Sequence, residues 1–164
     1  MPTERSAHPK VSAIVPNYNH ARFLEQRLRS VLEQTFTDLE LIYLDDASTD
    51  NSAAVFERFA GDPRVRSHVN AENSGSPFKQ WNRGVRLARG EYVWIAEADD
   101  YADPRLLETL VPLLDKHPHV GVAYCQSLEV DAEGQVGKVA SRRFVCCNPG
   151  RWDQAYVNSG RDEV

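Results

Sequence analysis

The chain has 164 residues, of which 41% are hydrophobic and 26% charged, so it is long enough to fold as one soluble globular domain with a sizeable core. Its formal net charge of −5, with no basic run, argues against nucleic-acid binding, and any anionic ligand would need a local source of positive charge. No stretch approaches the roughly 20 apolar residues that a membrane span requires.

The cysteines indicate the compartment. Cys125, Cys146 and Cys147 form no CxxC pair and no even-numbered disulfide framework, so we expect reduced thiols. The N-terminal segment is polar and has no apolar core typical of a secretion signal. These features predict a cytoplasmic protein, with any membrane association peripheral and at the inner face of the membrane.

Apolar runs and helical spacings alternate along the chain. In chain order we predict a strand at 11–16, a helix at 21–34, a strand at 39–46 and a helix at 48–61 that ends at Gly61. A strand at 64–70, a helix at 77–89 that Gly90 stops, and a strand at 91–98 follow. The last predicted elements are a helix from Pro104 to about 117 and a strand at 120–130 before a hairpin turn at 131–135. This alternation predicts an α/β fold, a Rossmann-like, mostly parallel sheet with helices on both faces.

Three parts are expected along the chain. Residues 1–10 form a disordered lead, 11–126 form the α/β core, and 127–164 form a hairpin followed by the beginning of a further region. The last segment mixes aromatic and polar residues and ends in mid-pattern, so we expect the protein to continue beyond it.

Polar residues cluster where the predicted parallel strands end. The residues that follow the four strands are Pro16, Asn17, Tyr18 and Asn19; Asp45 and Asp46; Asn70, Asn73 and Gly75; and Glu97, Asp99 and Asp100. Ligands of open parallel sheets bind beyond the carboxyl ends of the strands, so these residues are expected to line one cleft.

The acidic segment after the fourth predicted strand raises the question of a metal. Glu97, Asp99, Asp100 and Asp103 fall within seven positions, and their oxygens are hard ligands that suit Mg²⁺ or Mn²⁺. Solvated loop acids are the simpler interpretation, and for Asp103 a helix cap next to Pro104 is sufficient. For Asp99, which lies between two further acids, we favour a metal ligand.

The other candidates have competing interpretations. Asp45 or Asp46 could accept hydrogen bonds from a nucleobase, while an Asx-type turn explains either residue equally well. Tyr18 could stack on a base or simply pack. Lys79 and Arg83 lie four apart on one helical face and could meet phosphate, although a solvated face is the safer interpretation for Arg83.

Taken together, these motifs resemble the family 2 glycosyltransferases, which are inverting enzymes with the GT-A fold. The resemblance runs from about Val11 to Tyr124 and rests on "PNYN", "QTFTDLEL", "DDASTD" and "GEY" before the acidic "EADD", in the family's order. Each motif is weak by itself, whereas the ordered set is specific.

The resemblance implies roles for individual residues. Pro16, Tyr18 and Asn19 would border the nucleotide, Asp46 would contact the base, and Lys79 would approach the donor. Asp99, with Asp100 beside it, would hold Mg²⁺ or Mn²⁺ against the diphosphate, and Glu97 stands where the family often has Asp. The implied partners are a nucleoside-diphosphate sugar, with a UDP-sugar favoured, and a saccharide or lipid-linked acceptor.

The resemblance also implies that a part of the machinery is missing. The family's catalytic base lies beyond the acidic motif, and no residue of this chain matches it, so we expect a donor-binding fragment with little transfer activity by itself. A non-catalytic nucleotide-binding module remains the alternative. A sugar-phosphate nucleotidyltransferase would need a glycine-rich loop after the first strand, and a phosphoacceptor receiver domain would need its paired acids there; the chain has neither.

Overall fold

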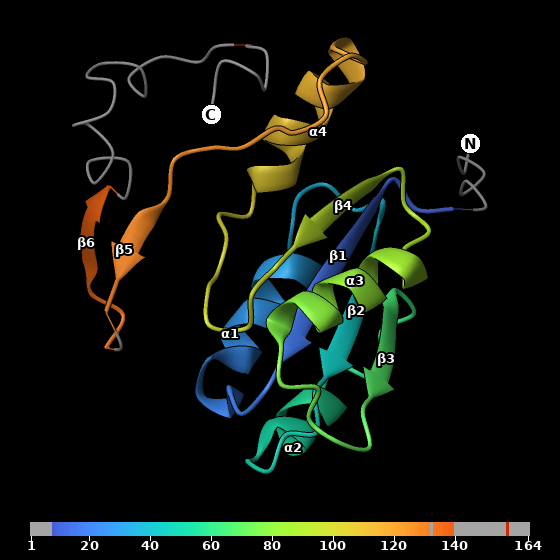
Figure 1. Cartoon of the computed structure of the whole chain (residues 1–164). Helices are drawn as coiled ribbons and strands as arrows, with labels where there is room; N and C mark the ends of the chain where they lie inside the picture. The colour runs from blue at the N-terminus through green and yellow to red at the C-terminus, as the bar shows by residue number, and fades with distance from the viewer. Residues whose placement is uncertain (1–7, 132, 140–156, 158–164) are drawn as a thin grey trace. The chain divides into compact units, whose positions relative to one another are not determined.

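The computed structural model describes residues 8–131, 133–139 and 157, and the chain divides into two compact units, Met1–Glu108 and Thr109–Val164. The elements in order are β1 Val11–Asn17, α1 Ala21–Leu32, β2 Leu39–Asp45, α2 Ser52–Glu57, β3 Val65–Val69, α3 Pro77–Leu87, β4 Tyr92–Ile95, α4 Leu106–Lys116, β5 Leu128–Val130 and β6 Val136–Val139 (Figure 1). No helix of the described residues is long and apolar enough to cross a bilayer.

The first unit is built on a four-stranded sheet with the order β3-β2-β1-β4, in which every neighbouring pair is parallel. The chain moves outward from β1 through β2 to β3 and then returns to place β4 on the other side of β1. The predicted α/β fold with a mostly parallel sheet is therefore confirmed, and the strand order reverses between β1 and β4.

Helices cover both faces of this sheet, as predicted. On one face, Ile14, Ile42 and Leu44 form a buried cluster, and α3 packs so closely that a Cβ on Gly84 would lie 2.4 Å from Cγ2 of Ile14. Successive side chains of a strand point to opposite faces. Tyr43 therefore points to the other face, where its ring stacks on Phe56 of α2 at a centroid distance of 4.2 Å. Figure 1 shows α3 in front of β1 and β2.

The proline in the central strand does not break the sheet. β1 continues to Asn17, one residue beyond the predicted end at Pro16. The carbonyl of Ile14 accepts a hydrogen bond from the N–H of Ala96 just after β4 ends, and alternate residues of a parallel strand bond to the same neighbour. The missing N–H of Pro16 therefore faces the side on which β4 has already ended, so no hydrogen bond of the sheet is lost.

Two helices are shorter than predicted. α2 runs from Ser52 to Glu57 and not from 48 to 61, and the residues before it belong to a loop in which the N–H groups of Ser48 and Thr49 donate to the side chains of Asp45 and Asn19 at 2.7 Å each. α3 ends at Leu87, since the N–H of Arg89 donates to Glu40 Oε1 at 2.9 Å.

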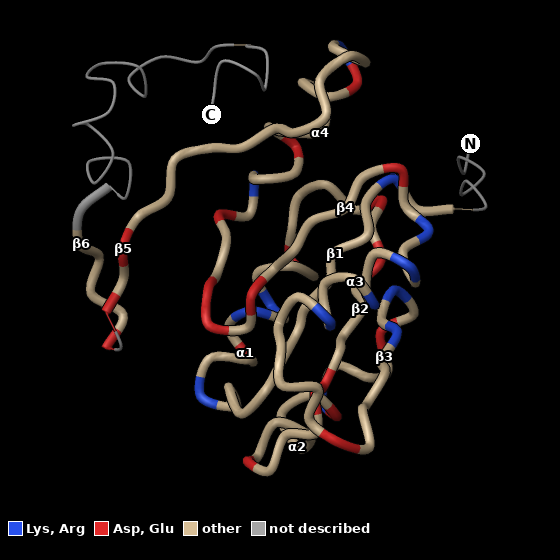
Figure 2. Tube along the Cα trace, in the orientation of Figure 1, with Lys and Arg blue, Asp and Glu red and all other residues tan. Residues whose placement is uncertain are grey.

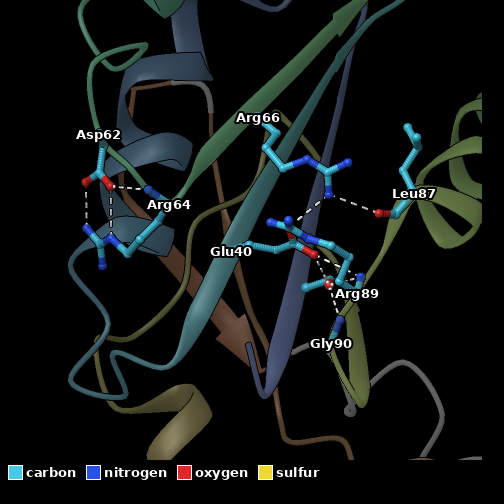
Figure 3. A network of polar contacts seen from close by, with 8 residues as sticks. Glu40, Asp62, Arg64, Arg66, Leu87, Arg89 and Gly90 are labelled. Atoms are coloured by element: carbon cyan, nitrogen blue, oxygen red, sulfur yellow. Dashed lines mark hydrogen bonds and ion pairs between the residues drawn. The ribbon is translucent and has the colours of Figure 1, made fainter. Parts of the chain in front are cut away.

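Gly90 has a different role from the predicted helix stop. A Cβ at this position would lie 2.6 Å from the backbone nitrogen of Ser12, so glycine permits the chain to enter β4 against β1. Nearby, Arg66 and Arg89 converge on Glu40 near the amino ends of the strands (Figure 3). The lack of a side chain at Gly90 and the ion pairs to Glu40 together hold the start of β4 against β1.

The second unit contains the predicted hairpin. β5 and β6 pair antiparallel, and the turn includes a bond from the N–H of Gly134, at φ 83°, to the carbonyl of Asp131. The strand predicted at 120–130 is confined to Leu128–Val130, because a strand is stabilised by its partner and β6 reaches only these residues in the described part of the chain. Cys146 and Cys147 lie outside the described residues.

Candidate functional site

All four strands of the first unit end at one edge of the sheet. Open parallel sheets bind ligands at this edge, at the point where the strand order reverses, which here lies between β1 and β4. Tyr18 follows β1 and is 45% exposed, and Glu97 follows β4. The sequence-predicted candidates from both strands therefore lie at the switch point.

The loops that follow β1 and β2 are tied together by side chains. The buried carboxylate of Asp45 accepts hydrogen bonds from the hydroxyl of Tyr43 at 2.7 Å and Nδ2 of Asn17 at 2.9 Å. Burial and the bond to Asp45 raise the pKa of Tyr43, so the phenol stays protonated as the donor. Asn19 adopts a positive φ of 59°, and its Oδ1 accepts the N–H of Thr49. Asp45 and Asn19 thus shape the edge of the site.

Asp46 occupies a different environment. It is 4% exposed, and its carboxylate accepts four hydrogen bonds from this chain. The donors are Asn70 Nδ2 at 2.5 Å, the Ser74 backbone N–H at 2.9 Å, the Ser74 hydroxyl at 2.7 Å and Gln80 Nε2 at 2.7 Å. Three of these bonds go to Oδ1 and one to Oδ2, so a nucleobase could bond to this buried carboxylate only at Oδ2 or by replacing a donor, and the predicted base contact would require local rearrangement.

The cations of α3 reach this same loop. Nζ of Lys79 donates to the carbonyl of Ser74 at 2.8 Å, which anchors an exposed ammonium at the carboxyl edge of the sheet. Arg83 is not merely part of a solvated face, because its Nη1 donates to Oδ1 of Asn70. Asn70 in turn donates to Asp46, so Arg83 supports the carboxylate network rather than facing bulk water.

The acids after β4 are far less satisfied. Asp99 and Asp100 are exposed, whereas Glu97 is half-buried, and its Oε1 and the indole Nε1 of Trp81 are both buried without a hydrogen bond of normal geometry. Burial raises the pKa of Glu97; the Trp81 indole opposes this rise, and the charges of Asp99 and Asp100 add to it. Figure 2 shows the acidic residues along the loop between β4 and α4. This segment, residues 97–105, is called the acidic loop below.

A buried arginine lies behind the acidic loop. Arg27 of α1 is 3% exposed, its Nε donates to the carbonyl of Glu97 at 2.7 Å, and its Nη2 lies 3.9 Å from Oδ2 of Asp100. Burial lowers the pKa of Arg27 to about 10, while the charges of Asp100, Asp99 and Glu97 raise it, so the guanidinium is protonated at neutral pH. The chain itself therefore supplies one cation to the cluster of acids.

Our sequence analysis missed Arg27, although the helical spacing contains a signal for it. Arg27 lies three residues after Leu24 and four before Val31, both of which are buried on α1. A charged residue within such an apolar stripe is placed on the buried face and needs a partner. The partner, the carbonyl of Glu97, lies 70 residues away and could not be identified from spacing.

The same acids have the chemistry to receive a divalent ion. Glu97, Asp99 and Asp100 offer hard oxygen donors, and the buried Oε1 of Glu97 lacks a partner. Among the described residues, no group of three or more His, Cys, Asp or Glu side chains could hold a metal ion by themselves. The donor set therefore fits an ion that takes one or two protein carboxylates and completes its shell with phosphate and water.

Known proteins resemble this chain along most of its length. The family model for glycosyl transferase family 2 matches residues 12–155. The glycosyltransferase GlyG of Streptococcus pneumoniae serotype 4 is 38% identical over 101 residues, which cover 61% of this chain and 33% of that protein. The chain spans about a third or less of the length of the first curated relatives it matches.

Two solved structures are similar in fold. TarS 1–349 of Staphylococcus aureus, in complex with UDP-GlcNAc, has a TM-score of 0.65 at 26% identity and covers 79% of this chain and 37% of its own. The mannosyltransferase PcManGT from Pyrobaculum calidifontis, in complex with GDP-Man and Mn²⁺, has a TM-score of 0.52 at 31% identity and covers 60% of this chain and 30% of its own.

Proposed function

The chain belongs to glycosyl transferase family 2 and has the GT-A fold, and from this premise we propose that it binds a nucleoside-diphosphate sugar at the switch point between β1 and β4 and serves transfer of the sugar to an acceptor hydroxyl. The observation that carries the proposal is the acidic loop at this edge of a parallel sheet, where Asp99 and Asp100 are exposed and Oε1 of the half-buried Glu97 lacks a hydrogen-bond partner. The TarS complex with UDP-GlcNAc supports a UDP-sugar as the donor.

Each candidate residue has a proposed part in donor binding. Tyr18 is half-exposed where β1 ends and would border the nucleotide together with Pro16 and Asn19. Asp46 would contact the base, either directly after rearrangement or by holding the Ser74 loop in place. The ammonium of Lys79 would attract the donor phosphates to an edge that otherwise carries negative charge.

Mg²⁺ or Mn²⁺ is the proposed cofactor, held by Asp99 with Asp100 beside it and Glu97 behind them. When bound, such an ion acts as a Lewis acid that stabilises the negative charge on the departing diphosphate. Arg27 keeps the loop acids close together in the absence of the ion, since its guanidinium contacts the Glu97 carbonyl and lies near Asp100. The PcManGT complex with Mn²⁺ supports this choice of cofactor.

The transfer itself would need a group from outside the described residues. In an inverting displacement, the acceptor oxygen bonds to the anomeric carbon as the bond to the diphosphate breaks, and a carboxylate takes the acceptor proton. No described residue is assigned to this base. We therefore propose that this segment binds the donor and that a further part of the protein completes the reaction.

The acceptor and the location are proposed at a coarser level. A saccharide or lipid-linked acceptor fits an enzyme that moves single sugars, and a cytoplasmic site of action, with peripheral contact to the membrane, agrees with the exposed free thiol of Cys125. Cell fractionation with an antibody against the chain would test the location, and recovery in the periplasm would contradict it.

Calorimetry with UDP and Mn²⁺ tests donor binding. We expect UDP to bind with Mn²⁺ and the affinity to fall about 100-fold or more in Asp99→Ala, because loss of a group that only supports a metal ligand already costs about 10- to 100-fold. Glu57→Ala, which removes an exposed carboxylate of α2, is the matched control and should bind as the unmodified chain does. Absence of UDP binding in the presence of Mn²⁺ would contradict the proposal.

A further inference from the structure

The acidic loop is fastened at one end to α1 and at the other end to Gln34, which lies two residues beyond the end of α1. At the first end, the Glu97 carbonyl accepts the 2.7 Å bond from Arg27 Nε. At the other end, Gln34 donates to the carbonyl of Asp103 at 2.7 Å and accepts the N–H of Leu107 at 3.0 Å. Residues 98–102, which include Asp99 and Asp100, therefore lie between two contacts, one made by α1 and the other by the segment that follows it.

The contact at the Glu97 end is built differently from the contact at Gln34. The Arg27 guanidinium lies over the Trp94 ring of β4, with Cζ 5.7 Å from the ring centroid, and near Asp100. It is almost fully buried, and its Nη1 has no hydrogen-bond partner. A buried cation is unfavourable unless it is compensated, so its presence indicates that the loop acids and the carbonyl compensate it.

We propose that Arg27 is a positioning residue: its guanidinium holds the Glu97 carbonyl and offsets the charge of the acidic loop, so that Asp99 is presented at the switch point before any ligand binds. This inference rests on the proposed function in one respect: donor and metal binding is the reason why Asp99 would need to be positioned. The contacts of Arg27 do not depend on that function. Arginine suits the role because its planar group donates to a carbonyl, stacks on an aromatic ring and stays charged at the same time.

The first test measures the order of the loop without any ligand. In Arg27→Gln, peptide-level hydrogen exchange of residues 98–102 should become about tenfold faster or more, while β1 and β2 exchange as before, because local opening needs less free energy than global unfolding. Arg29→Gln is the matched control, since Arg29 lies on the same helix, is exposed, and its side chain bonds to Glu25 and Glu33 and lies over the Phe59 ring.

The second test measures what the positioning achieves. UDP affinity with Mn²⁺ should fall about 10- to 100-fold in Arg27→Gln, whereas UDP affinity in EDTA should not change, because supporting groups around a metal site typically have effects of this size. Arg27→Lys keeps the charge but not the planar group, so its values should lie between those of the unmodified chain and of Arg27→Gln. If Arg27 only stabilised the fold, its replacement would not lower the UDP affinity with Mn²⁺ while leaving the UDP affinity in EDTA unchanged.

The outcomes separate the inference from the proposed function. If Arg27→Gln and Arg29→Gln show the same exchange in the acidic loop, or if exchange rises equally in β1 and β2, Arg27 is not a positioning residue. If Arg27→Gln does not fold, Arg27→Lys decides: loop-confined acceleration supports the inference, and exchange identical to the unmodified chain overturns it. If the unmodified chain fails to bind UDP with Mn²⁺, the proposed function is wrong, and the exchange data still decide on the loop.

Discussion

Glu40 and Glu97 are glutamates at opposite ends of the same sheet, and their surroundings differ in almost every respect. Glu40, in the second position of β2, is 2% exposed and accepts hydrogen bonds from Ser12 at 2.7 Å and from Arg66 and Arg89 at 3.0 and 2.8 Å (Figure 3). Glu97, just beyond β4, keeps a buried oxygen without a partner. The carboxylate of Glu40 is bonded within the protein, while that of Glu97 has an oxygen that could still bond to a ligand.

The pKa values of the two glutamates shift in opposite directions because only Glu40 has hydrogen bonds that outweigh the effect of burial. Burial alone would raise the pKa of Glu40, but the bonds from Arg89, Ser12 and Arg66 outweigh it and hold the pKa below its usual value. At Glu97, burial prevails and the pKa is raised. Unsatisfied acids are typical of functional sites, where interactions that would stabilise the free protein are left for a ligand.

The largest effect is expected at the satisfied end of the sheet. Replacing Glu40 by Ala removes the acceptor of the Ser12 hydroxyl and of the Arg89 guanidinium, and it leaves the N–H of Arg89 with the Ser12 oxygen and Arg66 with the carbonyl of Leu87 as their remaining acceptors. We expect the free energy of unfolding to fall by about 2–3 kcal/mol, since buried donors lose their acceptor while the two guanidinium groups, on side chains that are 31% and 49% exposed, can turn to water. Urea unfolding followed by circular dichroism measures it. Glu57→Ala is the control and should stay within about 0.5 kcal/mol, as exposed sites do.

Asp46 tests whether the carboxyl edge of the sheet also contains a satisfied carboxylate. In Asp46→Asn, one oxygen can still accept from Asn70, Gln80 and the Ser74 N–H, but the charge that strengthens these bonds is lost. We expect a loss of about 1–2 kcal/mol in urea unfolding, the difference between charged and neutral hydrogen bonds. An unchanged stability would show that Asp46 resembles Glu97 rather than Glu40.

The pH dependence of stability sharpens the same contrast. Because the pKa of Glu40 is lower in the folded state than in the unfolded state, its contribution is fully present above the unfolded pKa of about 4.3 and is lost as the pH falls toward the folded pKa. Thermal unfolding between pH 7 and pH 3 should show a decline that Glu40→Gln largely lacks. Parallel curves for the two proteins would exclude Glu40 as the source.

The sequence was sufficient to predict the strands of the sheet. It was also sufficient to predict that the polar residues following these strands lie at one edge, because both features depend on local patterns. The buried runs of β1 and β2 alternate with amphipathic α1 and α3, and this alternation alone requires crossovers and a parallel sheet. The lengths of α2 and α3 were not predictable in this way. The end of α3 depends on Glu40 accepting the N–H of Arg89, which lies 49 residues away in the sequence.

The candidate site was predictable only in its location. The hydrogen bonds that the Asp46 carboxylate accepts come from Asn70, Ser74 and Gln80, which are 24 to 34 residues away in the sequence. The support of the acidic loop depends on Arg27, whose partner is the backbone of Glu97 and not a side chain that a motif would contain. Residue type indicates which groups can bind a ligand, whereas tertiary contacts decide which of them are already engaged.

The smallest effect, opposite in sign, is expected at Glu97. Burial and the neighbouring Asp99 and Asp100 disfavour its charged form at neutral pH, so Glu97→Gln, which removes the charge and keeps the shape, should raise the free energy of unfolding by about 1 kcal/mol. The same variant should weaken Mn²⁺-dependent UDP binding in calorimetry. Glu40→Gln makes the same chemical change at the other end of the sheet and should be destabilised. If Glu97→Gln were destabilised as well, Glu97 would have to be satisfied by contacts like those of Glu40, and the acidic loop would be a structural element rather than a site held open for a ligand.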